Sequence, residues 1–156
     1  MHVKLLRYRI QFDSQNLRKL LGEWELYELI IFQLISNAIK FSNAGGCIII
    51  DTHVIKYQDQ FLLQTSVIDT GIGINQGKLE SIRSALKSNA QLELAVLPLK
   101  YQRSNVLGFG LQTAKLFTQL LGGSLEMTSL PLFKTQAKFS VPIKLSTFAR
   151  TTPTDS

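Results

Sequence analysis

Residues 34–42 read LISNAIKFS and residues 67–74 read VIDTGIGI, and these two segments are the most informative part of the chain. The first continues an apolar helical pattern and carries an amide and an amine, Asn37 and Lys40. The second is the end of an apolar strand that turns through two glycines behind one carboxylate, Asp69. Together they indicate a nucleotide pocket between a helix face and a glycine-rich turn.

The composition is that of an ordinary globular chain of 156 residues, 45% hydrophobic and 18% charged. It excludes a mainly disordered protein and predicts one domain over residues 1–146, followed by a polar tail or linker over 147–156. No run approaches the ~18 apolar residues of a membrane span, so no direct membrane span is expected. The net charge of +6 allows an anionic partner, but without an aromatic–basic cluster nucleic acid is not expected.

Hydrophobic periodicity predicts alternating groups of strands and helices. In chain order the expected elements are a strand over 3–12, a helix over 23–41, strands over 47–57 and 60–69, helices over 78–86 and 111–121, and strands over 124–128 and 135–143. Residues 17–21 are ambiguous, and residues 87–107 lack periodicity and are expected to form a loop. Because neighbouring strands are joined by hairpins, this order predicts an α+β fold, a two-layer α/β sandwich with helices on one face of a mixed, mostly antiparallel sheet.

Two amides interrupt the apolar stripe of the 23–41 helix. Gln33 and Asn37 are four residues apart and therefore share one line of the helix surface. Backbone groups in the core can satisfy both; alternatively, the Asn37 carbonyl oxygen can ligate a hard cation such as Mg²⁺. Lys40, three residues further on, can reach phosphates bound to that cation. Spacing alone leaves both interpretations open.

Asp69 ends its strand and faces a loop in which Gly71 and Gly73 permit a close backbone approach. A carboxylate only accepts hydrogen bonds, so the exocyclic amine of adenine is a natural ligand. The alternative is an Asp-Thr-Gly turn stabilised by its own side chain. A second glycine pair, Gly108 and Gly110, precedes the helix over 111–121, where exposed N–H groups can bind phosphate, although a plain loop–helix junction has the same sequence.

In this order and spacing the segments resemble the N, G1 and G2 boxes of the histidine-kinase-type ATPases, the GHKL superfamily with the Bergerat ATP-binding fold. LISNAIKFS at 34–42 is similar to the N box, VIDTGIGI at 67–74 to the G1 box and GFGLQTAK at 108–115 to the G2 box. GGSL at 122–125, followed by Ser129, resembles the next segment of sensor histidine kinases. The resemblance covers most of the chain and is closest to sensor and hybrid kinases.

The resemblance implies a role for each of these residues in binding ATP. Asn37 would ligate Mg²⁺, Lys40 would contact phosphate and Asp69 would bind the adenine amine. The residues that would shape the base pocket are Gly71, Gly73 and Ile74, and those that would flank the triphosphate are Gly108, Phe109, Gly110 and Leu111. Residues 75–107 would form the ATP lid.

The chain also departs from the family pattern. Gln33, which would belong to the catalytic site, stands where hydrolytic branches carry Glu, and an amide cannot act as the general base that activates water. Val106 replaces a glycine that usually lies two residues before Gly108, and an aromatic-rich F box is hard to find. Neither histidine, His2 or His53, is followed by the sequence of a phospho-acceptor box.

The resemblance therefore predicts the ATP-binding catalytic domain of a sensor or hybrid histidine kinase in two-component signalling. The γ-phosphate of ATP would pass to a histidine on a separate dimerisation domain, in cis or in trans, with a receiver domain downstream. A monomeric isolated domain in the cytoplasm, alone or as part of a membrane-bound receptor, is expected with it, and Cys47 as the sole cysteine agrees with a reducing compartment. The alternatives are a degenerate, non-catalytic nucleotide-binding or docking module and a GHKL-type ATPase that hydrolyses ATP.

Overall fold

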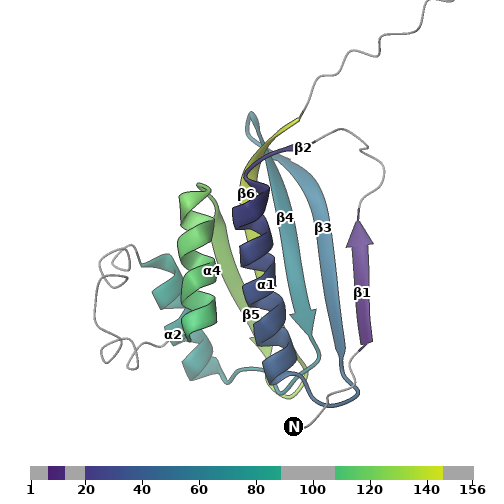
Figure 1. Cartoon of the computed structure of the whole chain (residues 1–156). Helices are drawn as coiled ribbons and strands as arrows, with labels where there is room; N and C mark the ends of the chain where they lie inside the picture. Colours follow the sequence, from purple (N-terminus) through teal and green to yellow (C-terminus); the bar gives the residue numbers. More distant parts are fainter. Residues whose placement is uncertain (1–6, 13–19, 89–107, 146–156) are drawn as a thin grey trace, which may run out of the picture.

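The computed structural model describes residues 7–12, 20–88 and 108–145, in which helices cover one face of a mixed sheet (Figure 1). The elements in chain order are β1 (Arg7–Phe12), β2 (Leu20–Leu21), α1 (Trp24–Phe41), β3 (Cys47–Tyr57), β4 (Gln60–Asp69), α2 (Gln76–Lys87), α4 (Phe109–Leu120), β5 (Ser124–Leu130) and β6 (Lys134–Leu145). The predicted two-layer α+β sandwich is confirmed. The predicted strands over 47–57 and 60–69 have the bounds that the structure gives them.

The sheet has the strand order β1-β3-β4-β6-β2, and β5 also pairs with β6. β3 and β4 form an antiparallel hairpin, β4 and β5 pair antiparallel with β6, and β1 lies parallel to β3. The sheet is therefore mixed and mostly antiparallel, as predicted. The two-residue strand β2, which pairs with Leu145 and Lys144, was not predicted because two residues carry no periodic signal.

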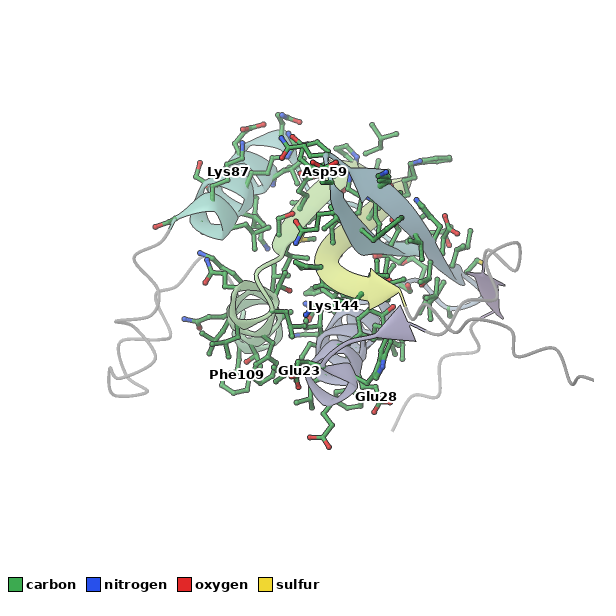
Figure 2. The ribbon with its side chains drawn as sticks, turned by 90° about the horizontal axis from the view of Figure 1, so that it is seen from above. Glu23, Glu28, Asp59, Lys87, Phe109 and Lys144 are labelled. Carbon is green, nitrogen blue, oxygen red and sulfur yellow. The ribbon has the colours of Figure 1, made fainter. Side chains whose placement is uncertain are left out.

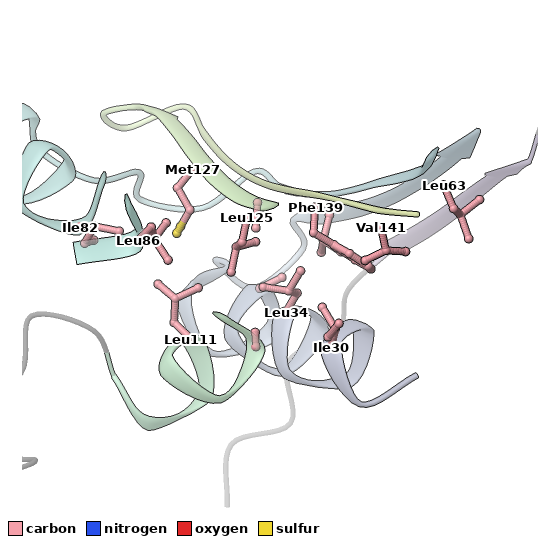
Figure 3. Packing of buried hydrophobic residues seen from close by; sticks show 14 of the residues in the cluster. Ile30, Leu34, Leu63, Ile82, Leu86, Leu111, Leu125, Met127, Phe139 and Val141 are labelled. Carbon is pink, nitrogen blue, oxygen red and sulfur yellow. The ribbon is translucent and has the colours of Figure 1, made fainter. Parts of the chain in front are cut away.

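The core lies between the helices and the covered face of the sheet. Ile30, Leu34 and Ala38 follow one i, i+4 row of α1 and are at most 4% exposed, which is the stripe that makes this segment an amphipathic helix. Figure 3 shows α1, α2 and α4 packing against β4, β5 and β6 through Ile30, Leu34, Leu63, Ile82, Leu86, Leu111, Leu125, Met127, Phe139 and Val141.

Three chain ends that matter for function lie at one end of the sandwich: the C-termini of α1 and β4 and the N-terminus of α4 (Figure 1). α2 begins two residues earlier than predicted because the Asn75 side chain caps it, accepting from the Lys78 N–H at 2.9 Å. Across the described ranges no helix is long and apolar enough to cross a membrane. The predicted tail over 147–156 and most of the predicted loop over 87–107 lie outside the described residues.

Candidate functional site

The C-terminal half of α1 packs against the first turn of α4 at a glycine. A Cβ atom placed at Gly110 would lie 3.0 Å from Gln33 Oε1 and 3.4 Å from Asn37 Oδ1. The two amide oxygens, from successive turns of α1, therefore point toward the N-terminus of α4, and the missing side chain at position 110 leaves them room. The structure thus brings together three of the residues that the sequence nominated.

The N-terminus of α4 presents backbone N–H groups without a competing anion of its own. Gly108 is the N-cap and makes no side-chain cap bond, and the first turn of the helix holds no acidic residue. Because the first N–H groups of a helix lack intrahelical acceptors and lie at the positive end of its dipole, this turn can bind phosphate groups.

Asp69 ends β4 as a buried carboxylate, 6% exposed. Its Oδ1 accepts a hydrogen bond from the Gly71 N–H at 3.0 Å. Burial raises the pKa of Asp69 above its usual value, and the bond from Gly71 acts in the opposite direction. A carboxylate has two oxygens, so Asp69 can hold its own turn with one and accept from a ligand amine with the other.

The turn after Asp69 needs glycine at two positions for different reasons. A Cβ atom at Gly71 would collide with the carbonyl oxygen of Phe41, the last residue of α1. Gly73 has φ 70°, and a Cβ atom there would collide with the carbonyl oxygen of Leu130. The glycines therefore let the turn lie between the end of α1 and the β5–β6 hairpin.

A serine far along the chain, Ser129, fixes the other end of this turn, and local periodicity gives no sign of it. Ser129 Oγ accepts from the Ile74 N–H at 2.8 Å, donates to the Lys134 carbonyl at 3.0 Å and lies 2.9 Å from Thr135 Oγ1. Ser129 was noted only as part of the family resemblance. Its bond to Ile74 joins positions 55 residues apart, which no local periodicity can report.

The remaining nominated residues lie in different environments. Lys40 is exposed, with Nζ 5.3 Å from the centroid of the Phe41 ring. Phe109 is 73% exposed and points away from the body of the domain (Figure 2). Leu111 is 6% exposed in the core, so its backbone N–H, not its side chain, is what it can offer a phosphate.

Other sequence predictions fall outside the described residues or on another part of the sheet. Val106, His2, most of the predicted lid and most of the stretch 79–104, where an F box would lie, are outside the described residues. His53 lies on β3 with Nδ1 3.9 Å from Asp51 Oδ2. Because Thr52 beside it faces the helices and is buried, His53 points to the opposite face of the sheet.

A divalent cation at this site would take its oxygen ligands partly from the protein and partly from substrate phosphates and water. The described residues contain no group of three or more His, Cys, Asp or Glu side chains that could hold a metal. Mg²⁺ commonly takes only one or two protein ligands and completes its shell with substrate phosphates and water. The Asn37 oxygen, directed toward the first turn of α4, fits such a ligand.

Comparisons with known proteins agree with this geometry. The family model described as "Histidine kinase-, DNA gyrase B-, and HSP90-like ATPase" matches residues 23–146. "Histidine protein kinase DivJ" of Caulobacter vibrioides is 29% identical over 160 residues, covering 97% of this chain and 25% of DivJ. "Circadian input-output histidine kinase CikA" of a Synechocystis species is 34% identical over 110 residues, covering 70% of this chain and 13% of CikA. The chain therefore spans a quarter or less of the length of these relatives.

Solved structures show the same fold. The mycobacterial sensor histidine kinase MprB aligns with a TM-score of 0.62 at 15% identity, covering 90% of this chain and 84% of that one. Full-length ShkA in complex with AMPPNP aligns with a TM-score of 0.63 at 18% identity, covering 90% of this chain and 26% of that one. At these identities the likeness supports the fold.

Proposed function

Because the chain belongs to the histidine kinase-, DNA gyrase B- and HSP90-like ATPase family, we propose that it is the ATP-binding catalytic domain of a sensor or hybrid histidine kinase. The observation that carries the proposal is that one helix end meets two glycine-dependent elements. α1 directs the Asn37 and Gln33 oxygens at the phosphate-binding turn of α4, and its last carbonyl, that of Phe41, lies against the Asp69 turn. Asn37 and Phe41 are about 6 Å apart along the helix, so both elements can contact one nucleotide.

Different residues of the site would bind different parts of the nucleotide. Asp69 would accept a hydrogen bond from the adenine amine while Gly71 holds its other oxygen. The N–H groups at the start of α4 would bind the phosphates, and Lys40 would add positive charge. Asn37 would hold Mg²⁺, which when bound neutralises phosphate charge. Gly71, Gly73 and Ile74, fixed by Ser129, would shape the base pocket.

The chemistry of Gln33 favours phosphoryl transfer over hydrolysis. Gln33 is the side chain nearest to the Gly110 backbone, and its amide cannot accept a proton from water. The domain would therefore position ATP for a nucleophile that comes from elsewhere, a histidine on a dimerisation domain in cis or in trans. A downstream receiver domain, a cytoplasmic location and a monomeric isolated domain belong to the same proposal.

Titration calorimetry with Mg-ATP, Mg-ADP and Mg-GTP tests the site. We expect Mg-ATP to bind, Asn37→Ala to weaken its binding and Ser36→Ala, at an exposed neighbouring position of α1, to leave it unchanged. Radiolabelled transfer to an added acceptor-helix domain then tests the kinase. Failure to bind ATP at millimolar concentration would overturn the proposal. Binding without transfer would favour the non-catalytic module, and phosphate release without an acceptor would favour the hydrolase.

A further inference from the structure

The turn between β5 and β6 exposes a run of apolar side chains. Leu130, Leu132 and Phe133 are 54%, 89% and 65% exposed. Two further exposed apolar residues lie at the same end of the molecule: Ile72, 54% exposed, whose carbonyl accepts from the Leu132 N–H at 2.7 Å, and Phe41, 47% exposed, whose carbonyl lies beside Gly71. We call these five residues the apolar tip.

The stability of the fold does not explain why position 132, the most exposed residue of this tip, is a leucine. Leu132 has φ 61°, a left-handed conformation that favours glycine or asparagine and strains a leucine. Its side chain is almost fully exposed, so it gains no burial in return. A strained and exposed apolar side chain points to a contact outside the domain.

Three segments at this end of the molecule carry lysines, and the acidic residues that border them are Asp69, which is buried, and Glu80, which pairs with Arg83. Residues 39–46, 70–79 and 129–136 contain Lys40, Lys78 and Lys134 and no aspartate or glutamate. The N-terminal end of α1, by contrast, carries the acidic residues of the helix, Glu25 and Glu28, and follows Glu23 at the N-cap. Each of the three segments that contribute to or adjoin the apolar tip thus carries one lysine, on a chain whose net charge is +6.

We propose that the apolar tip is a docking site for an anionic lipid surface. A hairpin turn that projects leucine and phenylalanine can insert into the boundary between headgroups and acyl chains without a complementary groove, and neighbouring lysines attract anionic headgroups. The high exposure of the apolar side chains and the lysines on the adjoining segments together favour a lipid surface over a second copy of the chain, whose own tip would carry the same lysines. Such docking is peripheral and reversible, and it does not rest on the proposed kinase activity.

Sedimentation with lipid vesicles tests the proposal on the whole chain. We expect binding to vesicles that contain roughly a third phosphatidylserine to exceed binding to pure phosphatidylcholine vesicles about tenfold and to fall as salt is added. Leu132→Gly combined with Phe133→Ser should abolish binding, and Lys78→Glu should weaken it on anionic vesicles. Tyr57→Ser, at the exposed β3–β4 turn, is the matched control and should bind like the unaltered chain.

The variant at the tip is designed to fold, because glycine adopts the φ of position 132 without strain. Thermal unfolding and Mg-ATP titration of the same variant separate this proposal from the nucleotide site, since the variant should be at least as stable as the unaltered chain and should bind Mg-ATP equally well. Absence of binding to anionic vesicles, or equal binding by the tip variant, would overturn the proposal. Self-association that is lost in the tip variant, without vesicle binding, would overturn it in favour of a second copy of the chain.

Discussion

Replacing Asp69 by asparagine separates binding of adenine from stability of the fold. The substitution keeps the shape of the side chain, and the asparagine Oδ1 can still accept from the Gly71 N–H. The amide –NH₂ group then lies where the second carboxylate oxygen was. It presents a hydrogen-bond donor to the adenine amine, which is also a donor. Recovering the bond by rotating the amide would break the bond from Gly71.

The size of the effect follows from this geometry. A hydrogen bond to a charged group contributes about 1.5–3 kcal/mol, so we expect affinity for Mg-ATP to fall about 10- to 150-fold. Guanine carries a carbonyl acceptor at the equivalent position, so the preference for ATP over GTP should narrow. The fold should not suffer, because the buried carboxylate is itself unfavourable when ionised.

The pH dependence of stability tests whether the ionised, buried carboxylate of Asp69 is unfavourable for the fold. Burial raises the pKa of Asp69 in the folded state, so between the unfolded value, near 3.8, and the raised value the folded state holds more protons. The protonated carboxyl group therefore contributes its full stabilisation of the folded state below pH 3.8, and this contribution is lost as pH rises through the raised pKa. Relative to Asp69→Asn, the unaltered chain should therefore lose stability as pH rises through that window.

Calorimetry with Mg-ATP and Mg-GTP, and urea unfolding across the same pH range, measure both effects. Asp51→Asn is the matched control, because Asp51 lies on β3 beside His53 and not in the site. Binding of Mg-ATP by folded Asp69→Asn within about twofold of the unaltered chain would refute the assignment of Asp69 to adenine, since one lost charged hydrogen bond costs more than that.

Three further substitutions test other parts of the structure. Gly110→Ala should lower Mg-ATP affinity about 5- to 100-fold, because its Cβ would lie 3.0 Å from an amide oxygen of α1; Gly77→Ala, in the first turn of α2, should leave calorimetric titrations unchanged. Gly73→Ala should destabilise the fold by more than about 2 kcal/mol in urea unfolding, whereas Gly45→Ala, also at positive φ but in open space, should cost about 1 kcal/mol. Lys115→Met should cost about 1–3 kcal/mol by removing the donor that bonds the carbonyls of Ala85 and Ser88. Burial lowers the pKa of Lys115, so the unfolded chain binds more protons below pH 10.5, and the stability of the unaltered chain relative to this variant should rise as pH approaches that value.

The sequence predicted what local patterns encode. Alternation bounded by glycines and polar turns predicted β3 and β4 to the residue, and the i, i+4 row predicted α1 to within one residue at its start. The motif residues Asn37, Asp69 and Gly110 were predicted to share a site because of their order and spacing. The structure places their elements at one end of the sandwich, which local patterns alone could not establish.

What the sequence did not predict depends on partners far away in the chain. Lys115 looks like a residue for the exposed face of α4, yet it is 2% exposed and donates to the carbonyls of Ala85 and Ser88 at the end of α2. A cation there is favourable because the C-terminus of a helix is its negative end. Neither this contact nor the bond from Ile74 to Ser129 leaves a periodic trace, because each pairs one side chain with one distant backbone group.

The arrangement makes the last two turns of α1 the element on which the whole site depends. Asn37 and Gln33 set the distance to α4, and the Phe41 carbonyl sets the distance to the Asp69 turn. The distance to the Asp69 turn is short enough to require glycine at position 71, and the contact at Gly110 is tight, so α1 cannot shift toward one element without leaving the other. Adenine binding and phosphate binding should therefore respond together to changes that move this helix end, and separately to changes confined to Asp69 or Gly110.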